Sequence, residues 1–330
     1  MIQNPLINGV NAASGGGEGN PMAGALWTSD LHFEGGRVRV RTTGAELAID
    51  RGLIVDVALW SAYYIPVRLK GLVTSLVRPG PRVWFAPDAP RPWYLLWLAA
   101  CWGGVRFARS AAGADAAIFF EDQTISRPPA CDLERRFNFG CDDVSKSHVA
   151  SVFEYVFGYA LTVDPETWTG PAVEKGEDNG AHDGRIVQCP TAPLPGRVYQ
   201  RVIDTVEGEH VVDLRTPCVG GTPVLTFIKR RPVRDRFANY NTSVVLHRPQ
   251  DLFSAEELAT IAQFCTAMKL DWGGLDILRD RADGRLYIVD VNKTDMPPLR
   301  LPWRQKLEAI SRLSKALLTM IDGKTPEANT

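Results

Sequence analysis

Hydrophobic and polar residues alternate most clearly near the carboxyl end of the chain. Two short apolar runs occupy residues 274–278 and 286–291, and a polar segment, 279–285, separates them. That segment contains Asp283-Gly284, and Asp-Gly between two alternating runs is a strong short-range signal for a β-hairpin. We therefore predict an antiparallel hairpin over these residues.

The predicted hairpin carries three oxygen-bearing side chains. Antiparallel pairing would place Asp276 near Asp290, and Asn292 lies two residues further on, so it shares the strand face of Asp290. Carboxylate and carboxamide oxygens suit Mg²⁺, which usually bridges to substrate phosphates. A simpler interpretation is that both carboxylates are solvated at strand ends. Asp290 argues against it, because an unpaired charge inside an apolar run is costly.

Similar patterns predict regular elements along most of the chain. Strands are indicated by short apolar runs between turn residues, and helices by an apolar stripe that follows a capping residue. The predicted elements are a β-hairpin within 31–43, a β-α-β unit over 82–121 with its helix at 92–102, a helix at 146–157 after Ser145, strands at 172–175, 198–204, 210–215 and 224–231, a helix at 254–268 with a Ser-x-x-Glu capping box, and a terminal helix at 301–321. The predicted fold class is α+β, preceded by a small α/β domain.

The segment 52–77 is apolar and aromatic, but Asp56, Pro66, Arg68 and Lys70 interrupt it. A membrane span needs roughly twenty largely uncharged residues, so we expect no span here. We predict that the segment packs against the core. The alternative is an interfacial segment that contacts a membrane, because aromatic residues stand beside basic ones.

Composition places the chain among ordinary globular proteins. Its 330 residues are 45% hydrophobic and 23% charged, and a formal net charge of -1 gives no sign of a nucleic-acid partner. The six cysteines show no C-x-x-C spacing, so reduced and mostly buried thiols are expected. Residues 1–20 lack a basic segment followed by an apolar one, which predicts no cleavable signal peptide and a cytoplasmic location.

Two lysines stand where they could bind phosphate. Lys146 lies in the first turn of a predicted helix, where the helix dipole disfavours a cation. Lys175 ends a predicted strand and precedes a loop containing Gly176, Gly180 and Gly184, and glycines let backbone N–H groups approach phosphate oxygens. The alternatives are an ordinary exposed lysine and an ordinary hairpin tip.

In their order along residues 138–298, these features resemble the ATP-grasp enzymes. That family has a lysine at a helix start, a strand lysine before a glycine-rich loop, a hinge, an Asp-x-Arg strand and a metal-binding hairpin. The resemblance implies an ATP-grasp fold, in which two α+β subdomains clasp ATP. It divides the chain into a poorly ordered segment 1–30, an N-terminal α/β domain 31–135, a catalytic region 136–300 and a C-terminal helix and tail 301–330.

The resemblance also implies roles for individual residues. The phosphates of ATP would be contacted by Lys146, Lys175 and Gly180. Adenine and ribose would be contacted by the hinge residues Gln200, Arg201, Val202, Ile203 and Asp204. One or two Mg²⁺ ions would be held by Asp276, Asp290 and Asn292. Charge on the transferred group would be stabilised by Arg215, Lys229 and Arg231, while Asn239 or Asn241 could orient the acceptor. Pairing of Asp213 with Arg215 along one strand is the simpler interpretation of that arginine.

The activity implied is that of an ATP- and Mg²⁺-dependent ligase joining a small-molecule carboxylate to an amine through an acylphosphate, with release of ADP and phosphate. Most ligases of the family have Glu at the position of Asp290, whereas its inositol-phosphate kinases have Asp-x-Asn. A small-molecule kinase that phosphorylates a hydroxyl is therefore an alternative. A nucleotide-binding module without catalysis is a third. The sequence leaves the acceptor open, and a homodimer is the commonest assembly for such a chain.

Overall fold

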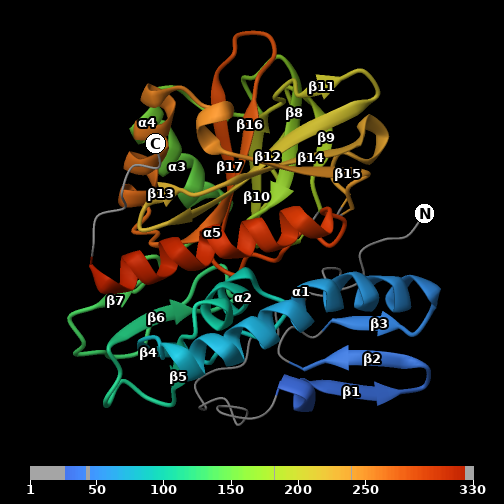
Figure 1. Cartoon of the computed structure of the whole chain (residues 1–330). Helices are drawn as coiled ribbons and strands as arrows, with labels where there is room; N and C mark the ends of the chain where they lie inside the picture. Colours follow the sequence, from blue (N-terminus) through green and yellow to red (C-terminus); the bar gives the residue numbers. More distant parts are fainter. Residues whose placement is uncertain (1–26, 42–44, 182, 239, 324–330) are drawn as a thin grey trace.

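The computed structural model describes residues 27–41, 45–181, 183–238 and 240–323. They form two halves on either side of the long helix α5 (Trp303–Asp322), as Figure 1 shows. The fold is α+β, as predicted. Most of the segment 1–30 lies outside the described residues, but Trp27–Asp30 forms a short 3₁₀ helix whose buried Asp30 pairs with Arg91.

The N-terminal half contains two small sheets and two helices. The predicted hairpin is confirmed and gains a third strand, so that β1, β2 and β3 form an antiparallel sheet. The predicted β-α-β unit is confirmed as a parallel sheet in the order β5-β4-β6-β7. The bounds are β1 (Leu31–Glu34), β2 (Arg37–Val40), β3 (Glu46–Ala48), α1 (Arg51–Val77), β4 (Arg82–Pro87), α2 (Leu95–Trp102), β5 (Arg106–Ala108), β6 (Ala116–Phe120) and β7 (Arg136–Phe137).

The start of α2 differs from the prediction by three residues. We expected the helix to begin at residue 92, but Arg91 and Tyr94 close a turn through the Tyr94 N to Arg91 O hydrogen bond of 3.0 Å. Tyr94 has extended backbone and is the N-cap, so helical geometry begins at Leu95.

The C-terminal half contains two antiparallel sheets that face each other. The smaller has the order β10-β8-β9, and the larger has the order β15-β14-β12-β16-β17, with β11 and β13 also paired to β12. The bounds are α3 (Lys146–Phe157), β8 (Gly170–Gly176), β9 (Arg185–Cys189), β10 (Arg197–Arg201), β11 (Val206–Glu207), β12 (His210–Val219), β13 (Thr222–Pro223), β14 (Thr226–Pro232), β15 (Ser243–His247), α4 (Ala255–Ala267), β16 (Trp272–Arg279) and β17 (Leu286–Asn292). The hairpin predicted around Asp283-Gly284 is therefore confirmed as β16 and β17, and Gly284 supplies the positive φ of its turn (77°).

Two hydrophobic cores hold these layers together. One packs α3 and α4 against the large sheet, with Phe153, Phe264 and Tyr287 fully buried. The other joins α1, α2 and α5 and reaches the opposite face of the same sheet through Phe227 and Trp272. The large sheet is thus covered on both faces at this end, and its remaining open surface faces the small sheet. Apolar burial of this kind is the main favourable term in folding.

The apolar segment 52–77 packs against the core on one side alone. It forms α1, with Tyr63 and Val67 buried, while Leu69 and Leu76 on the opposite side are 61% and 84% exposed. The prediction of core packing therefore describes the inner face and misses the outer one. By length and composition α1 could cross a membrane, although 22% of its most apolar 18-residue stretch is buried against the rest of the protein.

Candidate nucleotide-binding site

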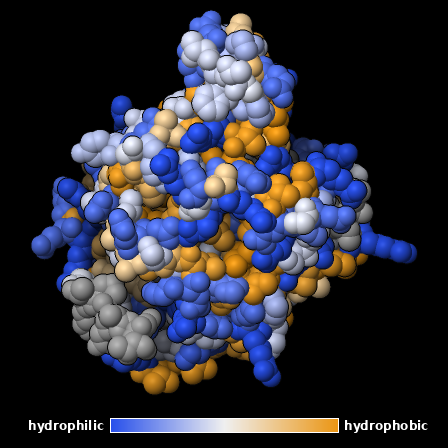
Figure 2. Space-filling model, turned by 90° about the horizontal axis from the view of Figure 1, so that it is seen from above, coloured by the Kyte–Doolittle hydropathy of each residue, from blue (hydrophilic) through white to orange (hydrophobic). Residues whose placement is uncertain are grey.

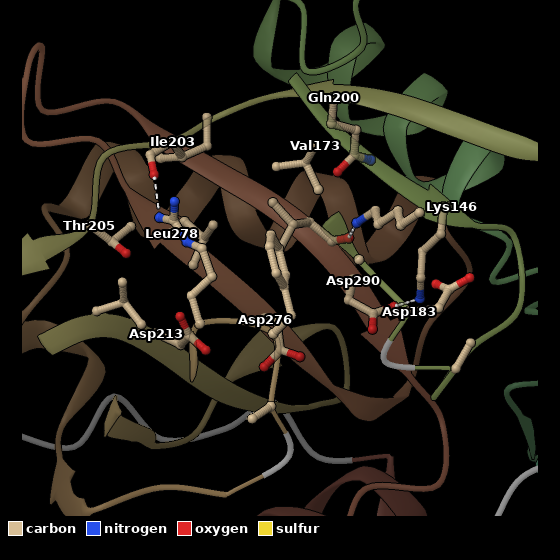
Figure 3. Close-up of a pocket in the computed structure, with 18 of the residues that line it drawn as sticks. Lys146, Val173, Asp183, Gln200, Ile203, Thr205, Asp213, Asp276, Leu278 and Asp290 are labelled. Carbon is tan, nitrogen blue, oxygen red and sulfur yellow. Dashed lines mark hydrogen bonds and ion pairs between the residues drawn. The ribbon is translucent and has the colours of Figure 1, made fainter. Parts of the chain in front are cut away.

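A cavity of about 240 Å³ lies between the two sheets of the C-terminal half. Its walls come from β8 and β10 on one side and from β12, β14, β16 and β17 on the other, as the close-up in Figure 3 shows. Seen from above in Figure 2, apolar residues gather along the middle of this half of the molecule, between hydrophilic margins. Figure 3 shows Lys146 and Asp290 at one end of the cavity and Ile203, Leu278 and Thr205 at the other.

Lys146 is buried at the charged end. The hydroxyl of Ser145 caps α3 by accepting from His148 N at 3.4 Å, which makes Lys146 the first helical residue, as predicted. Its Nζ donates to Asp290 Oδ1 at 2.5 Å and to Asn179 Oδ1 at 3.5 Å. The alternative of an ordinary exposed lysine is therefore wrong. The carboxylate of Asp290 compensates for a cation at a helix N-terminus, where the dipole is unfavourable.

Lys175 lies beside Lys146 on the adjoining strand β8. Its Nζ donates to the carbonyl oxygen of Val289 at 3.0 Å. Burial and, to a smaller extent, the Lys146 ammonium together lower the pKa of Lys175 from 10.5 to about 8, although Asp290 opposes both. A buried lysine with a depressed pKa inside a cavity is typical of functional sites. An anionic ligand would stabilise its charged form and raise this pKa again.

The loop after Lys175 is closed over this end by its acidic residues. Glu177 accepts from both the backbone N (3.0 Å) and the hydroxyl of Ser147, and Asp183 pairs with Arg197 on β10. The acidic composition of the loop is thus explained, because these carboxylates anchor it to protein donors. Gly180 has a φ of 74°, which a glycine adopts without strain.

Asp276 and Asp290 stand directly opposite each other, as predicted, because β16 and β17 pair them in register. Asp276 Oδ2 accepts from Arg215 at 2.7 Å, and Lys229 Nζ lies 3.9 Å from its Oδ1. Burial would raise the pKa of Asp276, but Arg215 and Lys229 outweigh that effect and hold it below its usual range. Oδ1 of Asp276 is buried and accepts no hydrogen bond from any described residue.

These residues fit a magnesium ion. The free Oδ1 of Asp276 and the facing carboxylate of Asp290 are hard oxygen donors, which Mg²⁺ prefers. Asn292 ends the same strand but does not line the cavity, and its Oδ1 accepts from both N (2.9 Å) and Oγ1 (3.2 Å) of Thr294, so it would have to release one of these donors to bind a metal. The described part of the chain has no group of three or more His, Cys, Asp or Glu suited to a metal. Substrate oxygens would therefore have to complete the coordination.

Arg215 does not line the cavity, but it binds two carboxylates, those of Asp276 and Asp295. Its guanidinium binds Asp276 and also Asp295, at 3.0 Å from Nε and 2.7 Å from Nη2. Gly274 makes room for this cluster, since a Cβ there would lie 2.8 Å from Cγ of Asp295 and 2.9 Å from Nε of Arg215. The alternative in which Arg215 pairs with Asp213 is wrong, because Asp213 pairs with Arg231.

Basic side chains surround the remaining wall of the cavity. Lys229, Arg231 and Arg236 line it beside Asp213 and Asp276. Burial lowers the pKa of Lys229, although Asp276 opposes this. Burial likewise raises the pKa of Asp213, although Arg231 opposes this. Three cations against two carboxylates leave this wall suited to an anion.

The hinge lines the cavity in part. Gln200, Arg201, Val202 and Ile203 lie along it, whereas Asp204 is exposed and uses Oδ1 to accept from Val206 N at 3.0 Å. Thr205 reaches the cavity instead of Asp204. The ribose role predicted for Asp204 therefore has no support in its position. Asn241 lines the cavity, and Asn239 lies outside the described residues.

Solved structures similar to this chain were found, whereas no protein-family model and no curated protein sequence matches it. The ATP-grasp ligase PsnB complexed with its precursor peptide PsnA2 and AMPPNP is 12% identical, with a TM-score of 0.46 over 73% of this chain and 96% of that one. The D-alanine–D-alanine ligase of Bacillus anthracis, complexed with ATP, is 10% identical, with a TM-score of 0.41 over 74% of this chain and 98% of that one. The fold is similar to that of ATP-grasp ligases.

The extent of this similarity varies. An ATP-grasp domain protein of Sphaerobacter thermophilus, described as RimK, is 12% identical with a TM-score of 0.44 over 73% of this chain and all of its own. Another PsnB complex is matched over 62% of its length. At these TM-scores the likeness by itself assigns neither an activity nor a substrate, so function must be argued from the residues of the cavity.

Two residues of the site, Arg236 and Asp295, belong to no recognisable sequence motif. Arg236 donates to the hinge carbonyl of Ile203 at 3.4 Å, and in Figure 3 Ile203 lies near Leu278 and Thr205. Arg236 follows β14 in a short 3₁₀ segment without a recognisable motif. Asp295 follows Asn292 by three residues and is almost fully buried, but an isolated acid after a strand is too common to stand out.

Proposed function

We propose that this chain is an ATP- and Mg²⁺-dependent ligase of the ATP-grasp type that joins a carboxylate to an amine in the cytoplasm. The observation that carries the proposal is a cavity in which the buried Lys146 and the half-buried Lys175 lie beside the strand carboxylates Asp276 and Asp290, with the apolar side chains of Ile203 and Leu278 at the other end. The end with the lysines suits the phosphates of ATP, and the apolar end suits an adenine ring. The ATP-grasp structures similar to this chain are described as complexes with ATP, AMPPNP or ADP with Mg.

In this proposal the chain's residues position three groups. Lys146 and Lys175 hold the β- and γ-phosphates. Asp276, Asp290 and Asn292 hold Mg²⁺, which when bound neutralises phosphate charge. The hinge carbonyl of Ile203 accepts from adenine after Arg236 releases it. Electrostatic preorganisation of this kind is usually the largest contribution to phosphoryl transfer.

The reaction proposed has two steps. A carboxylate oxygen of the acceptor attacks the γ-phosphorus, and the bond from that phosphorus to the oxygen bridging it to the β-phosphate breaks, which gives an acylphosphate and ADP. The amine then attacks the acyl carbon, loses a proton and expels phosphate. Arg231 and Lys229 would hold the acceptor carboxylate, because they border the same cavity as the metal carboxylates.

A carboxylate acceptor fits the cavity better than a hydroxyl. A hydroxyl needs a base to remove its proton during transfer, and Asp213, Asp276 and Asp290 are each engaged by a cation in the described structure. A carboxylate is already ionised and needs only countercharge. The kinase therefore remains the second candidate.

Phosphorus NMR of the protein with ATP, Mg²⁺ and a pool of small acids and amines tests the proposal. ADP with free phosphate, formed only when an acid and an amine are both supplied, is the result expected of the ligase. A new phosphomonoester without matching free phosphate would identify the kinase. ATP that stays intact in every pool would favour the non-catalytic module. The same assay on Lys175→Met tests the role of that lysine. Lys315→Met is its matched control, since Lys315 is exposed on α5.

A further inference from the structure

The helix α1 is held firmly to the body of the protein by its inner face. Tyr63 is buried and donates its hydroxyl to the carbonyl of Pro298 at 3.0 Å. Lys306 of α5 donates to the Leu59 carbonyl at 2.7 Å. At Gly71 the helix approaches α2 so closely that a Cβ would collide with the carbonyl group of Cys101. These contacts would all be lost if α1 crossed a membrane, so α1 stays on the protein surface.

The outer face of the same helix is apolar and uncovered in the described structure. Its most exposed apolar residues share one side of the helix and define a stripe: Ile54 near the start and, about three turns later, Ile65, Leu69, Leu72, Val73 and Leu76. Each of these six side chains is more than half exposed. From Ile54 to Leu76 the stripe is about 33 Å long, given the rise of an α-helix. A contiguous apolar surface of this size marks an interaction site.

The charges on α1 are all of one sign where they meet solvent. Arg51, Arg68 and Lys70 are exposed along the helix, and Arg78 follows its end. The one acidic residue of the helix, Asp56, is buried on the inner face. An apolar stripe bordered by basic residues is the pattern of a helix that lies in the interface of an anionic membrane.

A groove opens along the edge of the stripe. It encloses about 270 Å³ between α1, α2 and β5 and is lined by Leu72, Trp97, Val105 and Phe107, with Arg68 among its polar residues. An apolar groove with a guanidinium beside it suits an acyl chain whose headgroup is anionic.

A second copy of this chain fits the stripe less well than a lipid surface does. An antiparallel pair of α1 helices centred near Ile65 would place Arg51 of one copy beside Arg78 of the other. Asp50, the exposed N-cap beside Arg51, would offset only part of the charge of Arg51, Arg68, Lys70 and Arg78, and like charges in contact are destabilising. Anionic headgroups supply the missing countercharge.

We propose that α1 docks this protein onto the surface of a membrane rich in anionic lipid, with its apolar stripe buried among the acyl chains. The proposal does not depend on the activity proposed above. In Figure 1 α5 lies between α1 and the half that contains the cavity.

Co-sedimentation of the full chain with phosphatidylcholine vesicles, with and without phosphatidylglycerol, tests this. We expect the protein to sediment with the anionic vesicles and to be released by salt. Leu76→Gln should lower the vesicle affinity about tenfold or more, because one leucine side chain leaves the lipid. Arg68→Gln and Lys70→Gln should each lower it about fivefold, for anionic vesicles alone.

The matched control is Leu194→Gln, the same change at a half-exposed leucine of the loop before β10, which should bind vesicles like the wild type. Equal losses in Leu76→Gln and Leu194→Gln would overturn the proposal, as would wild-type protein that stays in the supernatant with anionic vesicles. Sedimentation velocity distinguishes the other occupant. A dimer that Leu76→Gln converts to monomer, without vesicle binding, would assign the stripe to a second copy.

Discussion

Replacing Lys175 by methionine should stabilise the free protein while it destroys nucleotide binding. Burial lowers the pKa of this lysine from 10.5 to about 8, and the neighbouring ammonium of Lys146 adds to the effect. The folded state therefore binds the lysine proton less tightly than the unfolded chain does. Wherever the lysine is charged in both states, that difference is a cost to folding.

The size of the effect follows from the same values. A difference between 10.5 and about 8 corresponds to about 3 kcal/mol, at roughly 1.4 kcal/mol for each tenfold change. Methionine leaves the carbonyl of Val289 without its donor, which costs about 1 kcal/mol. We therefore expect Lys175→Met to raise the free energy of unfolding by about 2 kcal/mol at neutral pH.

Urea denaturation over a pH series measures this directly. The gain in free energy of unfolding of Lys175→Met should be complete below pH 8. It should disappear as the pH rises towards 10.5, because the lysine of the wild type is then a neutral amine in the folded and unfolded states. Lys315→Met on the exposed side of α5 is the control and should change stability little at any pH. A Lys175→Met protein that is less stable than the wild type at neutral pH would show that the charge of Lys175 does not cost stability.

Three further changes test other parts of the site. Gly274→Ala should cost about 3–5 kcal/mol in urea denaturation, because its Cβ would disrupt the buried ion pair of Asp295; a loss below about 1 kcal/mol would contradict this. Asp290→Asn should abolish the Mg²⁺-dependent part of nucleotide binding in calorimetry but keep ADP binding in EDTA, and an unchanged metal dependence would remove Asp290 from the metal site. Asp276→Asn should flatten the loss of stability in acid, since a carboxylate whose pKa is depressed on folding contributes stability above about pH 4 that is lost as the pH falls; an acid limb like that of the wild type would count against it.

Local signals in the sequence were sufficient for most of the elements and for the metal hairpin. Asp283-Gly284 predicts the turn, the turn predicts the register, and the register places Asp276 opposite Asp290. The capping residue Ser145 likewise predicts the helix that begins at Lys146. Each of these depends on contacts between residues close in the sequence, or on a period that the sequence shows directly.

Contacts between distant residues could not be predicted in the same way. Asp213 and Arg215 share a strand face and looked like partners, but Arg231 and Asp295 approach from β14 and from the segment after β17 and pair with them instead. Asp204 has the residue type and place expected for ribose, yet it does not line the cavity, and its carboxylate accepts a local hydrogen bond from Val206 N.

The outer face of α1 could not be predicted for a different reason. An apolar helix has the same composition whether both faces are buried or one is left open, and only the packed structure shows that Leu69 and Leu76 have no cover among the described residues. Pattern alone therefore favoured a buried segment.

Calorimetric titration with a non-hydrolysable ATP analogue, with and without Mg²⁺, tests the central claim most directly. We expect one binding site whose affinity increases with Mg²⁺ and falls at least about a hundredfold in Lys175→Met, since two cations, Lys146 and Lys175, would face the phosphates. Lys315→Met should bind like the wild type. Absence of binding, or binding that Mg²⁺ and Lys175→Met leave unchanged, would contradict a nucleotide site between the two sheets.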